Sequence, residues 1–355
     1  MKILFLDKVL NKRVKDDRLR GVEVFNVCFL RDLVSLGHEV TLVIHPDWRP
    51  IIEREIPRSD RLVILESSKR AGKNLGCLVP FWRERKAKFD VLFLANVGNG
   101  LLIPYRFIQR FKMVDRTVLL AHKVPGERFL KSIDRKTVVV SVNHTISRPF
   151  EEAGFEVAEV YYGILDAKLF YPSPKSRSPE PLKFGMLGDL DSEWKGSDLA
   201  IKAFTKLPEE VADRCELHLA AFTHDMPNVD DPRIVTYHWI EREKVGDFLR
   251  SLDVMLCLSR DLGEMMETFC QTMVQGMLCQ LPQIVTPLEV FEEKLDEGGG
   301  MIVEDVESLV AAMTELASDQ STREALGLAA EKIARDRYVW DSEYFVSRFF
   351  RELKQ

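Results

Sequence analysis

The feature that most constrains the fold is a series of short apolar runs, rich in β-branched residues, with helical patterns between many of them. Strands that are apolar throughout are buried on both faces, as in parallel sheets covered by helices. The alternation therefore predicts an α/β protein made of two doubly wound domains in tandem, with a cleft between them. The expected strands are Lys2–Asp7, Glu39–Ile44, Leu62–Glu66, Val91–Ala95, Thr117–Ala121, Thr137–Val142, Leu182–Leu187, Glu216–Phe222, Arg233–Trp239, Val254–Ser259, Gln283–Thr286 and Met301–Val303, and the expected helices include Val22–Leu36, Asp198–Lys206, Arg242–Leu252 and Val306–Ala317.

Length and composition agree with two globular domains. The chain has 355 residues, 46% of them apolar and 30% charged, which excludes a disordered chain, a collagen and a coiled coil. The stretch Tyr171–Pro181 holds four prolines among serine and charged residues, which is typical of a linker. We therefore predict an N-terminal domain over residues 1–170, a linker over 171–181 and a C-terminal domain over 182–338, with a helix over 339–355 completing the first domain.

Charge divides the chain into a basic and an acidic part. Residues 1–150 contain 29 basic and 16 acidic residues, a net charge of +13, whereas the remainder carries −19. This asymmetry indicates that the two domains have different partners, and the basic one is expected to face something anionic, such as a phosphorylated glycan or a lipid headgroup. Nucleic acid is not expected, because the basic half has no helix-turn-helix, zinc or RNA-stacking signature.

Basic and apolar residues alternate in two segments of the basic half, Lys69–Lys88 and Tyr105–Arg116. Such alternation suits an anionic membrane surface. It is equally typical of two solvated amphipathic helices that pack on a sheet. Both interpretations stay open at this point.

The cysteines and the N-terminus bear on the compartment. The six cysteines show no paired metal-ligand spacing, and the apolar run at the N-terminus is too short for the core of a signal peptide. Free thiols in a reducing environment are therefore expected. We predict a cytoplasmic protein, with peripheral attachment to the inner face of the membrane as an open alternative.

The C-terminal half contains a pattern typical of an anion site. The buried strand Val254–Ser259 is followed by a polar loop, Arg260–Phe269, and then by a helix-like run over 271–279. The free N–H groups and the dipole of a helix N-terminus favour a phosphate. Glu267 in the loop and Gln275, eight positions later, could hold hydroxyls of one elongated ligand.

A second loop, over residues 188–196, follows the first strand of the same domain. It ends with Lys195-Gly196, directly before the helix expected at Asp198. A lysine in this place could neutralise a diphosphate. Taken alone, Lys195 is as readily a solvated lysine, and Glu267 a carboxylate that the helix dipole favours.

The segment Glu267–Pro282 resembles the Glu–seven residues–Glu signature of the retaining glycosyltransferases of family 4, the glycosyl transferases group 1, which have a GT-B fold of two Rossmann-like domains. Shorter matches elsewhere in the chain occur in the same order as in the family. They are Gly21–Glu23 at the opening of a helix, Leu36–Val40, Ser141–Gly154, Gly163–Asp166 with Phe170–Pro172, Gly185–Gly188 with Lys195-Gly196, and Gly300–Glu304.

The chain departs from the family pattern at chemically important positions. Gln275 replaces the second glutamate of the signature, which in the family contacts the ribose of the nucleotide, and Asp189 stands where the family often has arginine. Glutamine keeps hydrogen-bonding capacity, whereas an acid beside a diphosphate is unfavourable. Two functions are therefore compared below: an active transferase, and a non-catalytic GT-B protein that binds a glycan or partners an active transferase.

The resemblance implies a hexosyltransferase-type enzyme that moves a sugar from a nucleotide sugar to a glycan or lipid-linked acceptor, with retention of configuration, in polysaccharide or glycoconjugate synthesis at the cell surface. No cofactor and no metal are expected, although Asp189-Leu-Asp191 resembles a metal-binding pair of another glycosyltransferase fold. The predicted catalytic residues are Glu267, Lys195 and His122, of which His122 is equally consistent with packing at a strand end. The predicted donor-binding residues are Gly188, Asp189, Trp239, Ile240, Thr268, Phe269, Cys270, Gln271, Thr272 and Gln275, and the predicted acceptor-side loop is Gly21, Val22 and Glu23.

Overall fold

The computed structural model describes residues 1–7, 10, 19, 21–67, 78–173, 181–221, 229–263 and 267–351. These residues form two compact units, Met1–Leu165 together with Trp340–Gln355, and Asp166–Val339. The first boundary thus lies five residues before the expected one. Residues 166–169 belong to the second unit because Arg242 pairs with Asp166 and Arg250 donates to the carbonyl of Leu169. Most of the expected linker, residues 174–180, lies outside the described residues.

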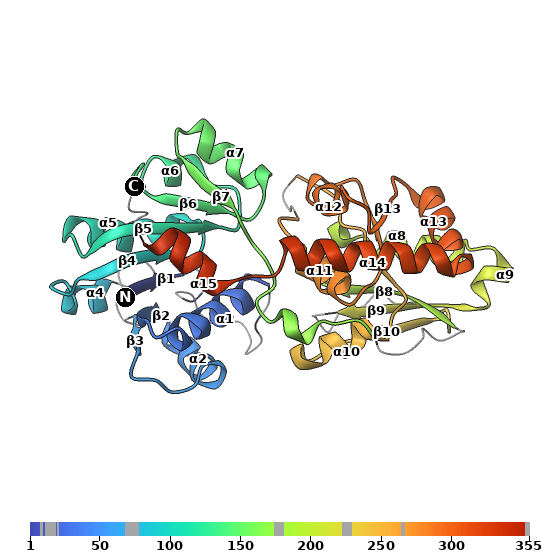
Figure 1. The fold of residues 1–355 in the computed structure, drawn as a ribbon, viewed down its shortest axis with the longest axis horizontal. Coiled ribbons are helices and arrows are strands. Elements are labelled where there is room, and N and C mark those ends of the chain that lie inside the picture. The colour runs from blue at the N-terminus through green and yellow to red at the C-terminus, as the bar shows by residue number, and fades with distance from the viewer. Residues whose placement is uncertain are drawn as a thin grey trace. The chain divides into compact units, whose positions relative to one another are not determined.

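The first unit is built on a parallel sheet in the order β3-β2-β1-β4-β5-β6-β7, seven strands among the described residues (Figure 1). The central strands β1 and β4 are almost wholly buried, as a sheet covered on both faces requires. The strands are β1 Lys2–Leu6, β2 Glu39–Ile44, β3 Leu62–Glu66, β4 Phe89–Leu94, β5 Val114–Ala121, β6 Val138–Ser141 and β7 Val157–Val160.

Helices connect these strands, and the end of the chain adds to them. The helices are α1 Val22–Ser35, α2 Arg49–Glu55, α4 Leu78–Arg83, α5 Leu102–Arg110, α6 Glu127–Leu130, α7 His144–Glu152, α15 Ser342–Phe345 and the short turns η1 Pro46–Trp48, η2 Asn99–Leu101 and η6 Val346–Phe350. Trp340 packs edge-on against Phe25 and Phe29 of α1, with ring centroids 4.8 and 5.4 Å apart. The C-terminal segment therefore contributes side chains to the core of the first unit.

The second unit contains a parallel sheet in the order β10-β9-β8-β11-β12-β13, six strands within the described part of the chain. Its strands are β8 Leu182–Gly188, β9 Cys215–Ala221, β10 Ile234–Tyr237, β11 Val254–Cys257, β12 Gln283–Val285 and β13 Gly300–Ile302. Its helices and turns are η3 Ala167–Leu169, η4 Glu193–Lys195, α8 Ser197–Thr205, α9 Glu209–Ala212, η5 Arg242–Lys244, α10 Val245–Arg250, α11 Gln271–Leu278, α12 Glu289–Leu295, α13 Val306–Ser318 and α14 Gln320–Arg337.

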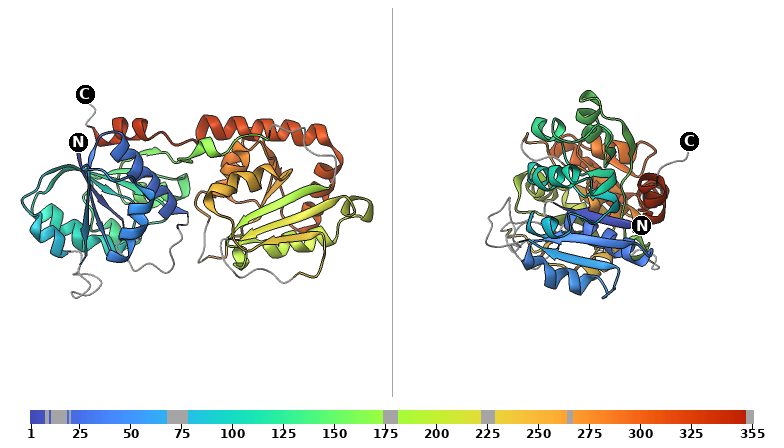
Figure 2. Two further views of the ribbon diagram at one scale, coloured as in Figure 1. Left: turned by 90° about the horizontal axis from the view of Figure 1, so that it is seen from below. Right: turned by 90° about the vertical axis from the view of Figure 1, so that its left-hand side faces the viewer.

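The long helix α14 lies along the second unit and contacts α11 (Figure 2). Gly327 allows this close approach, since a Cβ atom there would lie 2.4 Å from the carbonyl oxygen of Gln280. Leucine, phenylalanine and valine side chains of β8, β9 and β11 pack against α8 and α13. No helix among the described residues is long and apolar enough to cross a membrane.

The α/β prediction is confirmed. Each of the expected strands is present, with ends that shift by at most three residues. Strand β7 was not expected, because its four residues, Val-Ala-Glu-Val, include a charge. The helix expected over Arg242–Leu252 is divided into η5 and α10.

Strand order determines where each unit can bind a ligand. In the second sheet the order reverses between β8 and β11, so the connections after these two strands run to opposite faces. Loops beyond the carboxyl ends of such strands border a crevice, the usual ligand site of doubly wound sheets. In the second unit these are the loops that carry Lys195 and Glu267.

Candidate functional site

Lys195 and Glu267 form an ion pair at the switch point of the second sheet. The ammonium nitrogen of Lys195 lies 2.6 Å from Oε2 of Glu267, and the two side chains are only 18% and 10% exposed. Ser259 donates its hydroxyl to the same carboxylate oxygen over 3.3 Å. Burial alone would lower the pKa of Lys195, but the charge and hydrogen bond of Glu267, together with the nearby cysteines, outweigh burial and raise the pKa. Lys195 is therefore cationic at neutral pH.

A glycine places Lys195 at this position. Gly196 has a left-handed backbone, with φ of 75°, and a Cβ atom there would lie 2.1 Å from the carbonyl oxygen of Leu258. Only glycine can occupy this position without moving the backbone after β11. The loop after β8 can thus lie directly against the loop after β11.

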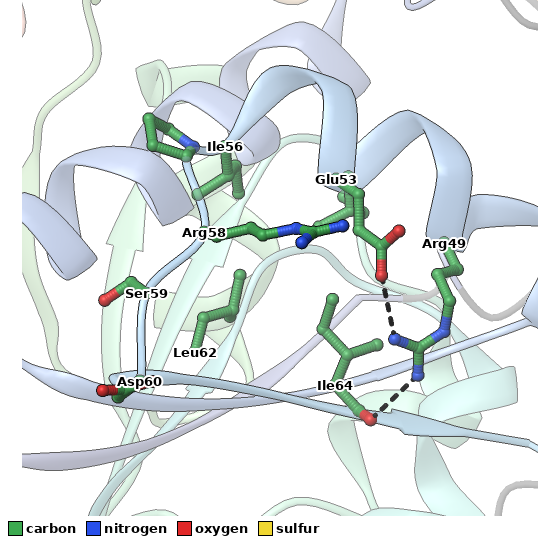
Figure 3. Close-up of a pocket in the computed structure, with 10 residues that line it drawn as sticks. Arg49, Glu53, Ile56, Arg58, Ser59, Asp60, Leu62 and Ile64 are labelled. Atoms are coloured by element: carbon green, nitrogen blue, oxygen red, sulfur yellow. Dashed lines mark hydrogen bonds and ion pairs between the residues drawn. The ribbon is translucent and has the colours of Figure 1, made fainter.

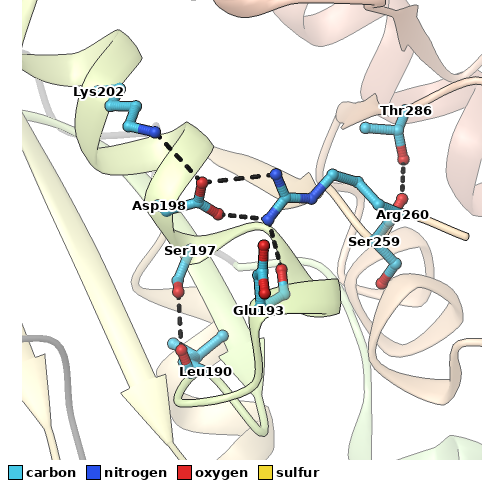
Figure 4. Close-up of polar contacts among 8 residues, drawn as sticks. All are labelled: Leu190, Glu193, Ser197, Asp198, Lys202, Ser259, Arg260 and Thr286. Carbon is cyan, nitrogen blue, oxygen red and sulfur yellow. Dashed lines mark hydrogen bonds and ion pairs between the residues drawn. The ribbon is translucent and has the colours of Figure 1, made fainter. Parts of the chain in front are cut away.

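Hydrogen bonds join the same two loops (Figure 4). Arg260 donates its backbone N–H to the carbonyl of Trp194 over 2.7 Å, and its guanidinium lies 2.7 Å from Asp198 at the start of α8. The guanidinium also donates to the carbonyl of Glu193. These contacts fix Lys195 from both sides of its own loop, so its ammonium group is held in place before any ligand arrives.

The start of α11 completes the cluster. Cys270 is the N-cap residue, has a left-handed φ of 58°, and donates its backbone N–H to Oε1 of Glu267 over 3.2 Å. Both carboxylate oxygens of Glu267 therefore accept hydrogen bonds. The predicted residues Thr268, Phe269, Gln271 and Thr272 flank this N-terminus, and Phe269 is buried.

Two cysteines near this cluster have shifted pKa values. Cys257 ends β11, and its thiol donates to the side-chain oxygen of Gln283 over 3.9 Å. Interaction between Cys257 and Cys270 lowers the pKa of Cys270 and raises that of Cys257. The Cys270 sulfur also lies 3.6 Å from the hydroxyl of Thr272. Both cysteines are buried and free.

A buried lysine that the sequence did not single out lies nearby. Lys294 of α12 is 2% exposed, its ammonium group donates to the carbonyl of Val290 over 2.9 Å, and it lies 4.7 Å from the ring centre of Phe269 and 5.1 Å from that of Tyr338. Burial lowers the pKa of Lys294 to about 8. Glu267 is among the charges that act on it, which places a second cation near the same carboxylate.

The remaining predicted donor residues surround this centre less closely. Gly188 ends β8, and Asp189 follows it with one carboxylate oxygen, Oδ1, buried and without a hydrogen-bond partner. Gln275 is half-buried within α11. Trp239 and Ile240 follow β10, the strand at the edge of the sheet. The geometry thus concentrates the site on the loops after β8 and β11.

His122 belongs to the first unit, directly after β5. It is 4% exposed and lies against Phe25 and Tyr162, with ring centroids 5.4 and 4.9 Å away, and its Nε2 has no hydrogen-bond partner. Burial lowers its pKa to about 3, so the ring is neutral at physiological pH. His122 can offer one ring nitrogen to a hydroxyl, but it is not a cation.

The predicted acceptor-side loop opens α1. Gly21 is the N-cap residue with φ of 43°, and Val22 and Glu23 form the first turn. One turn further, Asn26 donates to the buried carboxylate of Asp7 at the end of β1, and the Oδ1 atom of Asn26 has no hydrogen-bond partner. Asp7 and Asn26 were not predicted, although a charged residue directly after a buried strand is a signal that could have found Asp7.

Two other surfaces of the first unit contain none of the predicted site residues. A cavity of about 520 Å³ between α2 and β3 is lined by Arg49, Glu53, Arg58 and Asp60 among others, and contains none of the predicted site residues (Figure 3). The two basic segments form α4 and α5, which contact each other, although Lys69, Arg70 and Lys73 lie outside the described residues.

The second of these surfaces joins exposed aromatic and basic side chains, and we call it the aromatic–basic surface. Trp82, 56% exposed, lies 6.0 Å from Phe111, and the Arg85 guanidinium stacks on its ring at 4.8 Å. Its other exposed members are Val79, Arg83, Lys86, Lys88, Ile103, Arg106, Arg110 and Lys112. Helix packing therefore leaves large apolar side chains and several cations in contact with solvent.

The chain is similar to known proteins in sequence and in fold. Residues 181–319 match the family model described as glycosyl transferases group 1. Solved structures with the same fold include HepE from Anabaena in complex with UDP (16% identity, 96% of each chain covered, TM-score 0.74) and sucrose-phosphate synthase from Thermosynechococcus elongatus (14%, 96% of this chain and 95% of that one, TM-score 0.73). WaaG, a glycosyltransferase involved in lipopolysaccharide biosynthesis, aligns at 14% identity over 98% of this chain and 99% of that one, with a TM-score of 0.63. The comparison with curated proteins found no match.

The class of protein follows from these findings. The chain has the GT-B fold of two Rossmann-like units, as the resemblance implied. Within the second unit, residues 181–319 are similar to the glycosyl transferases group 1 model, and the Lys195–Glu267 pair lies within these residues.

Proposed function

We propose that this protein is a retaining glycosyltransferase that moves a hexose from a nucleotide sugar to a glycan or lipid-linked acceptor. The observation that carries the proposal is the Lys195–Glu267–Ser259 cluster, held at the N-terminus of α11 on the switch point of the second sheet, within the residues that match the group 1 model. HepE, which has the same fold, has been solved with UDP and with UDP-glucose. A nucleoside diphosphate sugar is therefore the ligand class that we test first.

The chemistry follows from the charges at the site. As the bond between the sugar and the diphosphate breaks, negative charge grows on the leaving phosphate oxygen. Lys195 is cationic and positioned, and a diphosphate that binds it competes with the Glu267 carboxylate for the same ammonium group. Glu267 then turns its oxygens to the sugar hydroxyls and orients the donor. We place the incoming acceptor on the leaving-group side, with retention of configuration.

Two other predicted residues, one in each unit, fit auxiliary roles in this proposal. Gln275 can donate and accept hydrogen bonds to a ribose, with a nucleotide preference that differs from that of a glutamate. His122, neutral and with a free ring nitrogen, can accept a hydrogen bond from a sugar hydroxyl. Because Lys195 and the N–H groups of α11 supply the positive charge, we propose that transfer needs no metal and no cofactor.

The test is calorimetric titration of the folded protein with UDP, GDP, ADP, dTDP and CMP and with their sugar derivatives, followed by mass spectrometry of hydrolysed donor. Binding of one nucleotide family, with slow hydrolysis of its sugar, is expected. No heat of binding and no change in melting temperature with any member would end the proposal.

A second candidate is a non-catalytic protein that binds a glycan or partners an active transferase. The buried, unpartnered oxygen of Asp189 favours it, because a carboxylate there repels a diphosphate. The Glu267→Ala variant separates the two functions. A transferase loses turnover, whereas a binding protein keeps its glycan affinity and its effect on the partner enzyme.

We further propose that the aromatic–basic surface holds the protein at an anionic membrane in the cytoplasm, near a lipid-linked acceptor of a cell-surface polysaccharide or glycoconjugate. Exposed tryptophan and phenylalanine beside arginine and lysine suit the interface between headgroups and acyl chains. WaaG, described as a lipopolysaccharide glycosyltransferase, has the same fold.

A further inference from the structure

A buried lysine contacts the segment that carries Glu267. Lys294 of α12 is 2% exposed, and its ammonium group donates to the carbonyl of Val290 over 2.9 Å. Among the described residues, no acidic side chain forms an ion pair with it. Burying a cation without a counter-ion lowers the stability of a protein. The proposed transfer reaction does not use this charge, so its position requires another explanation.

Two aromatic rings take the place of a counter-ion. The ammonium nitrogen of Lys294 lies 4.7 Å from the ring centre of Phe269 and 5.1 Å from that of Tyr338. Both distances are within the roughly 6 Å over which a ring face attracts a cation, and this attraction is strongest where water is excluded. The two rings also meet edge to face, with centroids 5.9 Å apart. The ammonium group therefore joins α12, the end of α14 and the segment before α11.

Phe269 lies between the two parts of the proposed donor site that must keep their geometry. Glu267 accepts hydrogen bonds from Lys195 on one oxygen and from the backbone N–H of Cys270 on the other. Cys270 has a left-handed φ of 58°, which is unfavourable for a residue with a Cβ atom and persists only where the surroundings hold it. Phe269 is 4% exposed, so a fixed ring there restrains both neighbours.

We infer that Lys294 is a positioning residue of the donor site, which acts through Phe269 and Tyr338 to hold residues 267–270 in the conformation that binds a nucleoside diphosphate; this inference rests on the proposed function. The charge is required because an apolar side chain of the same length has no such attraction to the ring faces. Lys294 itself does not contact the donor. Its burial lowers stability and favours binding, as is common for residues that serve a site.

The first test uses Lys294→Met in the full chain, because methionine has a similar length and no charge. We expect UDP, or the nucleotide that binds best, to bind about tenfold more weakly at pH 7. The melting temperature should rise, because a buried charge is removed. A lysine with a purely structural role would not separate affinity from stability in this way. Lys332→Met is the control, since Lys332 is exposed on α14 and pairs with Asp336.

A double-variant cycle tests whether Lys294 acts through Phe269. Phe269→Leu keeps an apolar side chain and removes the ring face, so it should weaken binding by a similar factor. The double variant should also bind about tenfold more weakly than the parent, rather than about a hundredfold, because each change removes the same interaction. Tyr338→Phe keeps its ring and should bind like the parent protein.

The pH dependence gives a second measurement of the same effect. Burial lowers the pKa of Lys294 to about 8, so the ammonium group loses its proton between pH 7 and pH 9.5. The terminal phosphate of the nucleotide, with a pKa of about 6, stays ionised throughout. The other titratable groups that act on Lys294 or border it are Glu267, Glu293, Cys257, Cys270 and Tyr338. Affinity of the parent should fall over this interval, and the fall should be absent in Lys294→Met.

Three results would overturn the inference: unchanged affinity of Lys294→Met, additive losses in the double variant, or a fall with pH that persists in Lys294→Met. If the parent protein binds no nucleotide, the proposed function is wrong. Hydrogen exchange of the ligand-free protein then decides whether Lys294 holds the segment. Faster exchange of the Cys270 amide in Lys294→Met would support this role, and an unchanged rate would exclude it.

Discussion

The ammonium group of Lys195 lies 2.6 Å from the carboxylate of Glu267, although the two residues are 72 positions apart in the chain. They meet because β8 and β11 are neighbours at the point where strand order reverses. The carboxylate also accepts hydrogen bonds from Ser259 and from the backbone of Cys270. The pair therefore forms the centre of a preorganised group of polar atoms, and the first predictions concern it.

Replacing Lys195 with methionine should weaken binding of a nucleoside diphosphate about 30- to 150-fold, because a charge-assisted hydrogen bond to phosphate contributes roughly 2–3 kcal/mol. Titration calorimetry measures the change. Lys206→Met is the matched control, since Lys206 pairs with Glu307 on the exposed surface of the same unit. Equal affinity of the Lys195 variant and the parent would exclude Lys195 from the donor site.

Glu267→Gln should lower the free energy of unfolding of the second unit by about 3 kcal/mol, because Lys195 is then left mostly buried without its counter-ion. The double variant Lys195→Met, Glu267→Gln should lose less than the single one, since no unpaired charge remains. Hydrogen exchange of strands β8 and β11 reports the unfolding of this unit. A double variant that is less stable than Glu267→Gln would contradict the argument.

Gly196→Ala should destabilise the second unit by about 2 kcal/mol or more and reduce donor affinity, because the added methyl group meets the carbonyl of Leu258. Gly263→Ala provides the comparison. Gly263 has a similar φ of 81°, but nothing lies within 4 Å of its Cβ position, so only backbone strain of about 1 kcal/mol is expected. Comparing the melting temperatures of the two variants should separate the effect of backbone strain from the effect of the steric clash with Leu258.

Lys294→Met should stabilise the protein in a pH-dependent way. Burial lowers the folded-state pKa to about 8 from 10.5, so folding disfavours the charged form. Burying the lysine therefore lowers the free energy of unfolding by up to about 3 kcal/mol, and this loss is complete below pH 8. It disappears as pH rises toward 10.5, because the unfolded chain binds more protons than the folded protein in this interval. Denaturant unfolding at pH 7 and pH 10 should show a clearly larger gain for the variant at the lower pH. A gain of equal size at both values would contradict a charge effect.

The aromatic–basic surface should bind anionic liposomes at low salt. Trp82→Ala with Arg110→Glu should reduce recovery in the pellet roughly tenfold, since each cation near such a surface contributes about 1 kcal/mol. Lys136→Glu changes an exposed lysine elsewhere in the same unit and should have little effect. Equal recovery of the parent protein with neutral liposomes would remove the electrostatic part of the proposal.

The sequence predicted the sheets well because buried strands leave a local signature. Runs such as Val91–Ala95 and Val254–Ser259 are almost wholly apolar. Continuous apolar runs of this length are typical of strands that are buried on both faces of a sheet. The unexpected strand β7 is short, contains a glutamate and lies at the sheet edge, where burial is incomplete. The loops after β8 and β11 were also predicted, because glycine, lysine and a helix start follow buried strands there.

The partners within the site were decided by tertiary structure. Ser259 was read as part of a strand, and nothing in its neighbours indicates that it donates to Glu267. Lys294 lies in a helix with many charged residues, so its sequence resembles a solvated face, although the side chain is buried against Phe269 and Tyr338.

The sequence by itself determined two doubly wound units and the loops on which chemistry could occur, since hydrophobic periodicity records how each segment is buried. Only the tertiary structure decided that Lys195 pairs with Glu267 and that Trp340 returns to the first core. The physical reason is that local patterns determine which face of an element is buried, whereas strand order and close approach at Gly196 determine which distant side chains meet.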